Sequence, residues 1–142
     1  MRILAVDYGE ARTGLAISDF TGTISSPLTV IHEKKFESLI EKIAVAVSDN
    51  EACRIVVGNP INMNGTNGKK SVKCKLLAKR LNERLGLPVE MWDERLTTVA
   101  AHGIMNENNR RGKQRSERID AVAAALILEG YLGYLKNQKG VE

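Results

Sequence analysis

The order of strand and helix patterns along the chain is the feature that most constrains how it folds. Three short strand patterns open the sequence, at 2–6, 15–19 and 24–31, and the first two are typical of a hairpin around the turn at 8–14. Helix and strand patterns alternate in the rest of the chain. An antiparallel meander followed by this alternation predicts an α/β fold, in which a mixed five-stranded sheet carries helices on both faces.

The later elements follow from hydrophobic periodicity and from residues that begin or end helices. Gly86 is placed to end a helix, and Pro27 is typical of an edge strand. Ser116 is expected to cap the final helix, whose buried stripe is predicted to contain Ile119, Val122, Ala123, Leu126 and Ile127. The expected elements are helices at 36–47, 74–85 and 116–135, strands at 53–58 and 88–92, a short helix capped by Thr97 or Thr98, a basic loop at 106–115 and a frayed tail at 136–142.

Length and composition indicate an ordinary globular chain. It has 142 residues, the usual size of one domain, so residues 1–142 are expected to form a single domain. Hydrophobic residues make up 43% and aromatic residues only 4%, which predicts an aliphatic core. The 21 Lys and Arg residues outnumber the 17 Asp and Glu residues, giving a net charge of +4. This excess fits a polyanionic partner such as nucleic acid without requiring one.

The cysteines and the apolar segments indicate the cellular compartment. Cys53 and Cys74 form no C-x-x-C pair and have no His cluster beside them, so a zinc site is not expected. Cys53 is predicted to lie in the core and Cys74 on an apolar helix stripe. The longest apolar run, 121–128, is too short to cross a membrane, and the N-terminus opens into a strand rather than a signal peptide. We therefore expect a reducing, cytoplasmic location and no membrane partner.

Acidic residues mark three separate elements at places where chemistry can occur. Asp7 ends the first strand and Asp93-Glu94 follow the last one, and ligands of open α/β sheets bind beyond such carboxyl ends. Because adjacent residues on an extended backbone point to opposite faces, only one of Asp93 and Glu94 can easily face Asp7, and the alternation does not select which. Asp120 lies at the edge of the apolar surface of the final helix, where a carboxylate needs a partner.

Each acid also has a purely structural interpretation. Asp7 could accept backbone N–H bonds from Gly9 and its neighbours in a turn. The Asp93-Glu94 pair could form an ion pair with Arg95 or begin a helix, and Asp120 could be a first-turn helix acid favoured by the dipole.

Taken together, the three acidic positions favour a divalent metal centre. Carboxylates brought close to one another raise each other's pKa values, and a hard cation relieves that repulsion. Mg²⁺, or Mn²⁺ in its place, takes oxygen ligands, and Mg²⁺ keeps several waters. Two such ions about 4 Å apart can activate water and stabilise the leaving oxygen in phosphodiester cleavage. The candidate catalytic residues and metal ligands are therefore Asp7, Asp93, Glu94 and Asp120.

Four motifs carry a resemblance to a known family. DYGEARTGLAISD, GNPINMNGT, DERLTT and DAVAAALILEGYL occur in this order and at spacings similar to those of the YqgF family, also called RuvX. The resemblance covers residues 2–135, and the four motifs together are specific. The sequence departs from the family at Asn59, where the family usually carries an apolar residue between Gly58 and Pro60. This departure bears on the shape of the following loop rather than on the acids.

The resemblance implies a ribonuclease H-like fold related to the RuvC resolvases, and a cytoplasmic bacterial nuclease. It implies maturation of the 5′ end of pre-16S ribosomal RNA, in which a pre-ribosomal particle could be a partner, with Holliday junction cleavage as the second expectation. By motif match, Asp7 takes the position of the family's first-strand acid. Asp93 and Glu94 take the middle position, and Asp120 takes that of the final-helix acid.

Basic residues close to the acids are candidates for nucleic-acid binding. A dense basic segment directly precedes Asp120, and such a segment could hold phosphates, although a charge run is often only a solvated loop. Arg12 and Arg95 each neighbour a proposed acid and could contact phosphate or form a structural ion pair. The residues of the basic segment are Arg110, Arg111, Lys113, Arg115 and Arg118.

Two alternatives belong to other classes of protein. Asp7-x-Gly9 followed by Gly14 also resembles the first phosphate loop of sugar-kinase and actin-like ATPases, but these need a second Asp-x-Gly loop, which this sequence lacks. A non-catalytic nucleic-acid-binding factor on the same fold is the other alternative, and the acids argue against it. Junction cleavage would call for a two-fold homodimer, whereas RNA processing could be done by a monomer.

Overall fold

The computed structural model describes residues 1–60, 68–96 and 112–140, and within the last helix it describes the side chains of residues 119–138. The short helix expected from Thr97 or Thr98, and most of the expected basic loop, lie outside these residues. The elements are β1 (Ile3–Asp7), β2 (Arg12–Ser18), β3 (Ser25–His32), α1 (Phe36–Asp49), β4 (Arg54–Asn59), α2 (Lys69–Leu85), β5 (Val89–Asp93), the 3₁₀ turn η1 (Glu94–Leu96) and α4 (Gly112–Gly140).

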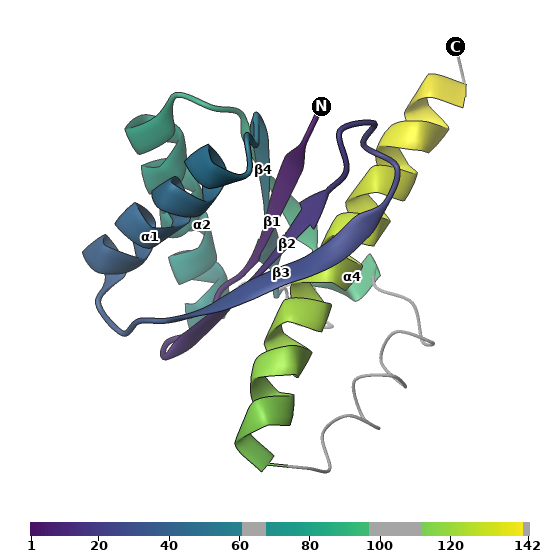
Figure 1. Cartoon of the computed structure of the whole chain (residues 1–142). Coiled ribbons are helices and arrows are strands. Elements are labelled where there is room, and N and C mark those ends of the chain that lie inside the picture. The colour runs from purple at the N-terminus through teal and green to yellow at the C-terminus, as the bar shows by residue number, and fades with distance from the viewer. Residues whose placement is uncertain (61–67, 97–111, 141–142) are drawn as a thin grey trace.

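The five strands form one mixed sheet in the order β3-β2-β1-β4-β5. β1 and β2 pair antiparallel, as do β2 and β3, whereas β4 runs parallel to both β1 and β5. The mixed sheet expected from the pattern order is therefore confirmed. Because β1, β4 and β5 are parallel, their carboxyl ends lie at the same edge of the sheet (Figure 1).

Helices cover both faces of the sheet, as predicted. α1 and α2 lie on one face and α4 crosses the other (Figure 1). Alternation along β1 divides its side chains between the two layers, since Leu4 and Val6 pack under α1 and α2 while Ile3 and Ala5 pack under α4. Both cores are mainly aliphatic, in line with the low aromatic content.

The proline predicted for an edge strand and the glycine predicted to end a helix both lie at the expected places. Pro27 is in β3, the edge strand, beside a register shift between Leu15 and Ala16 of β2. An edge position tolerates the missing backbone donor of proline. Gly86 ends α2 in the left-handed conformation, with φ of 69°, and its N–H donates to the Asn82 carbonyl.

The final helix differs from its prediction at both ends and in its buried face. α4 begins at Gly112 rather than at Ser116, and it continues to Gly140 instead of fraying after Leu135. Lys, Gln and Arg dominate the added turns and are good helix formers, which accounts for the extension. Its backbone therefore includes Lys113, Arg115 and Arg118, which the sequence placed in a loop or at the helix start.

The buried stripe of α4 also differs from the predicted one. Of the predicted residues only Ile127 is fully buried, and the observed stripe is Ala121, Ala124, Ile127, Leu128, Tyr131 and Leu132. The centre of α4 is apolar all round, so periodicity alone does not select a face. Small alanines face the sheet because α4 approaches β2 very closely.

Cys53 is exposed rather than part of the core, because it precedes β4 instead of lying within it. Cys74 is buried on the inner stripe of α2, as expected. None of the described helices is long and apolar enough to cross a membrane.

Candidate active site

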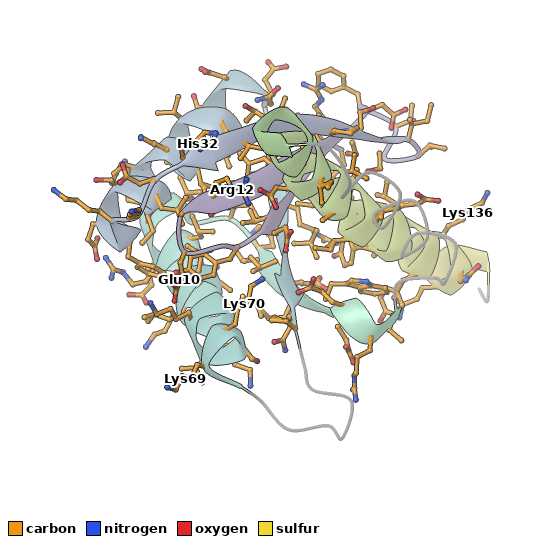
Figure 2. All side chains as sticks on the ribbon, turned by 90° about the horizontal axis from the view of Figure 1, so that it is seen from below. Glu10, Arg12, His32, Lys69, Lys70 and Lys136 are labelled. Atoms are coloured by element: carbon orange, nitrogen blue, oxygen red, sulfur yellow. The ribbon has the colours of Figure 1, made fainter. Side chains whose placement is uncertain are left out.

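The carboxyl ends of the parallel strands bring two of the predicted acidic positions to one edge of the sheet. β1 ends at Asp7, and β5 ends at Asp93, from which the chain passes into η1 at Glu94. Asp120 approaches from the opposite layer on α4. Figure 2 looks at this end of the sheet, with Arg12 near α4 and Lys70 at the start of α2.

Asp120 reaches the site because β2 carries a glycine where α4 crosses it. A β-carbon on Gly14 would lie 1.9 Å from the backbone oxygen of Asp120, so only glycine allows this approach. The Arg12 Nε lies 3.3 Å from Asp120 Oδ2, which pairs the two side chains across β2 and α4. The structure therefore places Arg12 as an ion-pair partner of one candidate acid.

Asp7 lies in an environment that resists its ionisation. Its pKa is raised from 3.8 to about 7, first by burial and then by the negative charge of Glu94. Lys70 opposes this rise, and Asp120 adds to it. The structural alternative of a turn aspartate is not observed, because the Gly9 N–H lies 3.4 Å from Thr13 Oγ1 and no described residue donates a hydrogen bond to the Asp7 carboxylate.

The adjacent acids Asp93 and Glu94 have opposite surroundings. Asp93 is held by Arg95, with contacts of 3.0 Å to Nε and 2.7 Å to Nη2, and this pairing lowers its pKa. Burial raises the pKa of Glu94, and its Oε2 is buried with no hydrogen-bond partner among the described residues. Glu94 rather than Asp93 therefore faces Asp7.

A basic residue that the sequence pattern did not single out also acts on this cluster. Lys70, in the first turn of α2, opposes the rise in the pKa values of both Asp7 and Glu94. The sequence pattern missed Lys70 because the helix predicted at 74–85 begins five residues too late, whereas α2 begins at Lys69. A lysine pair at a helix start is unusual, since the helix dipole favours acids there.

The start of α2 is fixed to the end of β4 by one buried pair. Ser71 Oγ donates to Asn59 Oδ1 at 2.5 Å, and both residues are buried. Asn59 is the residue that departs from the family pattern, and the structure gives it this specific partner. The pair brings Lys70 close to the carboxyl ends of the neighbouring strands.

Of the other basic residues predicted to bind nucleic acid, the structure describes only the side chain of Arg95. Arg95 is occupied by Asp93. Arg110 and Arg111 lie outside the described residues, and the structure gives only the backbone of Lys113, Arg115 and Arg118.

A sheet of this strand order, with α1 and α2 on one face and α4 on the other, is the ribonuclease H-like fold. Thermus thermophilus RuvC in complex with a Holliday junction substrate superimposes with a TM-score of 0.60 at 12% identity, over 92% of this chain and 94% of that chain. The yeast mitochondrial Holliday junction resolvase Ydc2 gives a TM-score of 0.61 at 12% identity, over 97% and 80% of the two chains. At this identity the similarity establishes the fold alone.

Sequence comparison defines the family. The family described as "RuvX: Holliday junction resolvase" matches residues 1–134, and this chain belongs to it. A relative from Thermoanaerobacter pseudethanolicus, named "Putative pre-16S rRNA nuclease", is 40% identical over 97% of this chain and 100% of its own length. A relative of the same name from Halothermothrix orenii is 40% identical over 99% of this chain and 100% of its own length.

Proposed function

We propose that this chain is a single-domain, metal-dependent nuclease that hydrolyses phosphodiester bonds of structured nucleic acid. Its proposed substrate is the 5′ region of pre-16S rRNA. The observation that carries the proposal is the burial of Asp7 and Glu94 at one edge of the sheet, where the charges of Glu94 and Asp120 both raise the pKa of Asp7. The names of the relatives support the choice of substrate.

The donor set fits a hydrated Mg²⁺ or Mn²⁺ ion. Glu94 Oε2 is buried without a hydrogen-bond partner among the described residues, and the Asp7 carboxylate accepts no hydrogen bond from them. No three acidic, His or Cys side chains of the described residues are close enough together to hold one ion. An ion here would therefore take one or two carboxylates directly and keep several waters, which is usual for Mg²⁺.

When bound, such an ion lowers the pKa of a coordinated water and neutralises charge on the phosphate. Asp7 and Glu94 would hold it, and Arg12 would orient the Asp120 carboxylate toward the same site. Arg95 occupies both carboxylate oxygens of Asp93, so Asp93 would not act as a ligand. Lys70 balances part of the negative charge at neutral pH.

The second candidate function is cleavage of four-way DNA junctions. It is favoured by the description of the family that matches the chain. Either substrate would place the protein in the cytoplasm, which is compatible with its two free thiols.

The test is cleavage of pre-16S rRNA, single-stranded RNA and a four-way DNA junction with Mg²⁺, with Mn²⁺ and with EDTA. Asp7→Asn and Asp120→Asn should abolish cleavage, whereas Asp49→Asn, an exposed acid at the end of α1, should leave it unchanged. RNA cleavage with this dependence supports rRNA processing, and junction cleavage alone supports the second function. Nucleic-acid binding without cleavage of any substrate would instead identify a non-catalytic factor.

A further inference from the structure

The first five residues of α2 include three exposed lysines, Lys69, Lys70 and Lys73. The first turn contains no acidic residue, and the preceding Gly68 offers no side chain to cap the helix. Cations at a helix N-terminus oppose the helix dipole, which favours negative charge there. The arrangement therefore works against the stability of the helix, which is typical of residues that serve a function.

These lysines have no ion-pair partner among the described residues, in contrast to the two arginines further along the same helix. Arg80 pairs with Glu37 at 2.6 Å, and Arg84 pairs with Glu41 at 2.9 Å. The two arginine charges in the second half of α2 are thus paired with α1, whereas the lysine charges at its start remain available.

The start of α2 lies beside the acidic centre. The Ser71–Asn59 hydrogen bond fixes it to the end of β4, between the strands that end at Asp7 and Asp93. Lys70 is close enough to act on Asp7 and Glu94, and Figure 2 shows Lys69 and Lys70 at this same end of the molecule. Arg12 lies on the α4 side of the acids.

We propose that Lys69, Lys70 and Lys73, the α2 basic turn, form a docking surface for the phosphate backbone of the substrate on the α2 side of the acidic centre. A strand held there continues over Asp7 and Glu94 towards Arg12. Lysine ammonium groups bind phosphates as point charges without reading bases, so this surface positions the strand and leaves sequence selection elsewhere. The inference rests on the proposed nuclease function.

The test measures binding of fluorescein-labelled single-stranded RNA and of a labelled four-way DNA junction by anisotropy, in EDTA, across a range of salt concentrations. The test variant is Lys69→Gln/Lys73→Gln. The matched control is Lys79→Gln/Lys136→Gln, which removes the same charge from two exposed lysines away from the acidic centre. Cleavage by each protein is measured in parallel with Mg²⁺.

The test variant should bind about tenfold more weakly at moderate salt, and the slope of log affinity against log salt for RNA should fall by about 1.4. The control should match the wild type. Lys69→Glu should weaken binding while the Tm stays equal or rises, because an acid suits the helix start.

Equal binding by the test variant and the wild type, or equal losses in the test and control variants, would overturn the docking surface while leaving the nuclease function intact. A wild-type protein that neither binds nor cleaves nucleic acid would overturn the proposed function, and the docking surface with it.

Discussion

Glu94 lies over Gly58, with its Cγ and Cδ each 3.3 Å from the point that a β-carbon on Gly58 would occupy. The same point lies 2.5 Å from Ile127 Cδ1 on α4. Gly58 is the last residue but one of β4, so the missing side chain leaves room for Glu94 beside the end of β1. The orientation of this acid thus depends on a glycine of a neighbouring strand.

Gly58→Ala should therefore lower both stability and activity. The added methyl group must displace the buried Ile127 or Glu94, and overpacking of this kind costs about 1–3 kcal/mol. Urea unfolding and cleavage kinetics measure the two effects. Gly133→Ala is the control, because a β-carbon on Gly133 meets nothing within 4 Å. Alanine at this helical position should raise the free energy of unfolding by about 0.5–1 kcal/mol. Unchanged stability and kcat/KM in Gly58→Ala would show that Glu94 does not depend on this space.

The adjacent acids should differ sharply in their contribution to activity. Glu94→Gln removes a buried carboxylate next to Asp7 and should lower kcat by at least about a hundredfold. Asp93→Asn breaks a partly exposed pair with Arg95, which is worth less than about 1 kcal/mol, and should retain most activity. Mn²⁺ binding followed by electron paramagnetic resonance should be weakened in Glu94→Gln alone. The opposite ranking of the two variants would assign the site to Asp93.

Asp7 should make the metal-free protein less stable as pH rises. Its pKa is about 7 in the folded state against an ordinary value of 3.8, so between these values the folded state binds more protons than the unfolded state. Stability is therefore lost as pH rises from about 4 to 7, by an amount on the order of 2–4 kcal/mol.

Asp7→Asn removes this loss of stability, so the variant should have a higher free energy of unfolding than the wild type at pH 8 in EDTA. The difference in stability between the two proteins should disappear below about pH 5. Thermal unfolding across pH measures it. Mn²⁺ should narrow the difference by stabilising the ionised wild-type carboxylate. Asp93→Asn should show no such gain, because Arg95 holds the pKa of Asp93 low. A less stable Asp7→Asn at pH 8 would contradict the assigned environment of Asp7.

Much of this fold could be predicted from the sequence, because its strands and two of its helices have clear periodicity. Asp7 at the end of a short aliphatic run and Gly86 at the end of an amphipathic stripe are local signals, and the structure confirms both positions. The face of α4 could not be predicted, since its apolar residues surround the helix. Which face of α4 is buried depends on the contact of Asp120 with Gly14, a residue far away in the sequence.

The details of the site depended on geometry that sequence spacing does not contain. Strand alternation could not choose between Asp93 and Glu94, because the chain leaves the strand for η1 between them. Lys70 does not stand out in the sequence because it lies in a lysine-rich helix whose other charges are solvated or paired. Only the packing of α2 against β4 shows that this one lysine acts on the acids.

The buried Asn59–Ser71 pair predicts a non-additive effect on stability. Ser71→Ala removes the hydroxyl that donates to a buried amide oxygen and should cost about 1–3 kcal/mol. Asn59→Leu installs the kind of apolar residue usual in the family, and the Ser71 hydroxyl can then turn to a helix carbonyl, so its cost should be smaller.

The double variant Asn59→Leu/Ser71→Ala leaves neither polar group without its partner, so its stability should be closer to wild type than the sum of the single effects. A coupling free energy of about 1–2 kcal/mol in urea unfolding is expected. Ser48→Ala, an exposed serine near the end of α1, combined with Asn59→Leu is the additive control. Because this pair fixes the start of α2 beside Asp7, Ser71→Ala should also weaken RNA binding in EDTA, and the double variant should recover part of it. Strict additivity would mean that the hydrogen bond does not hold α2 to β4.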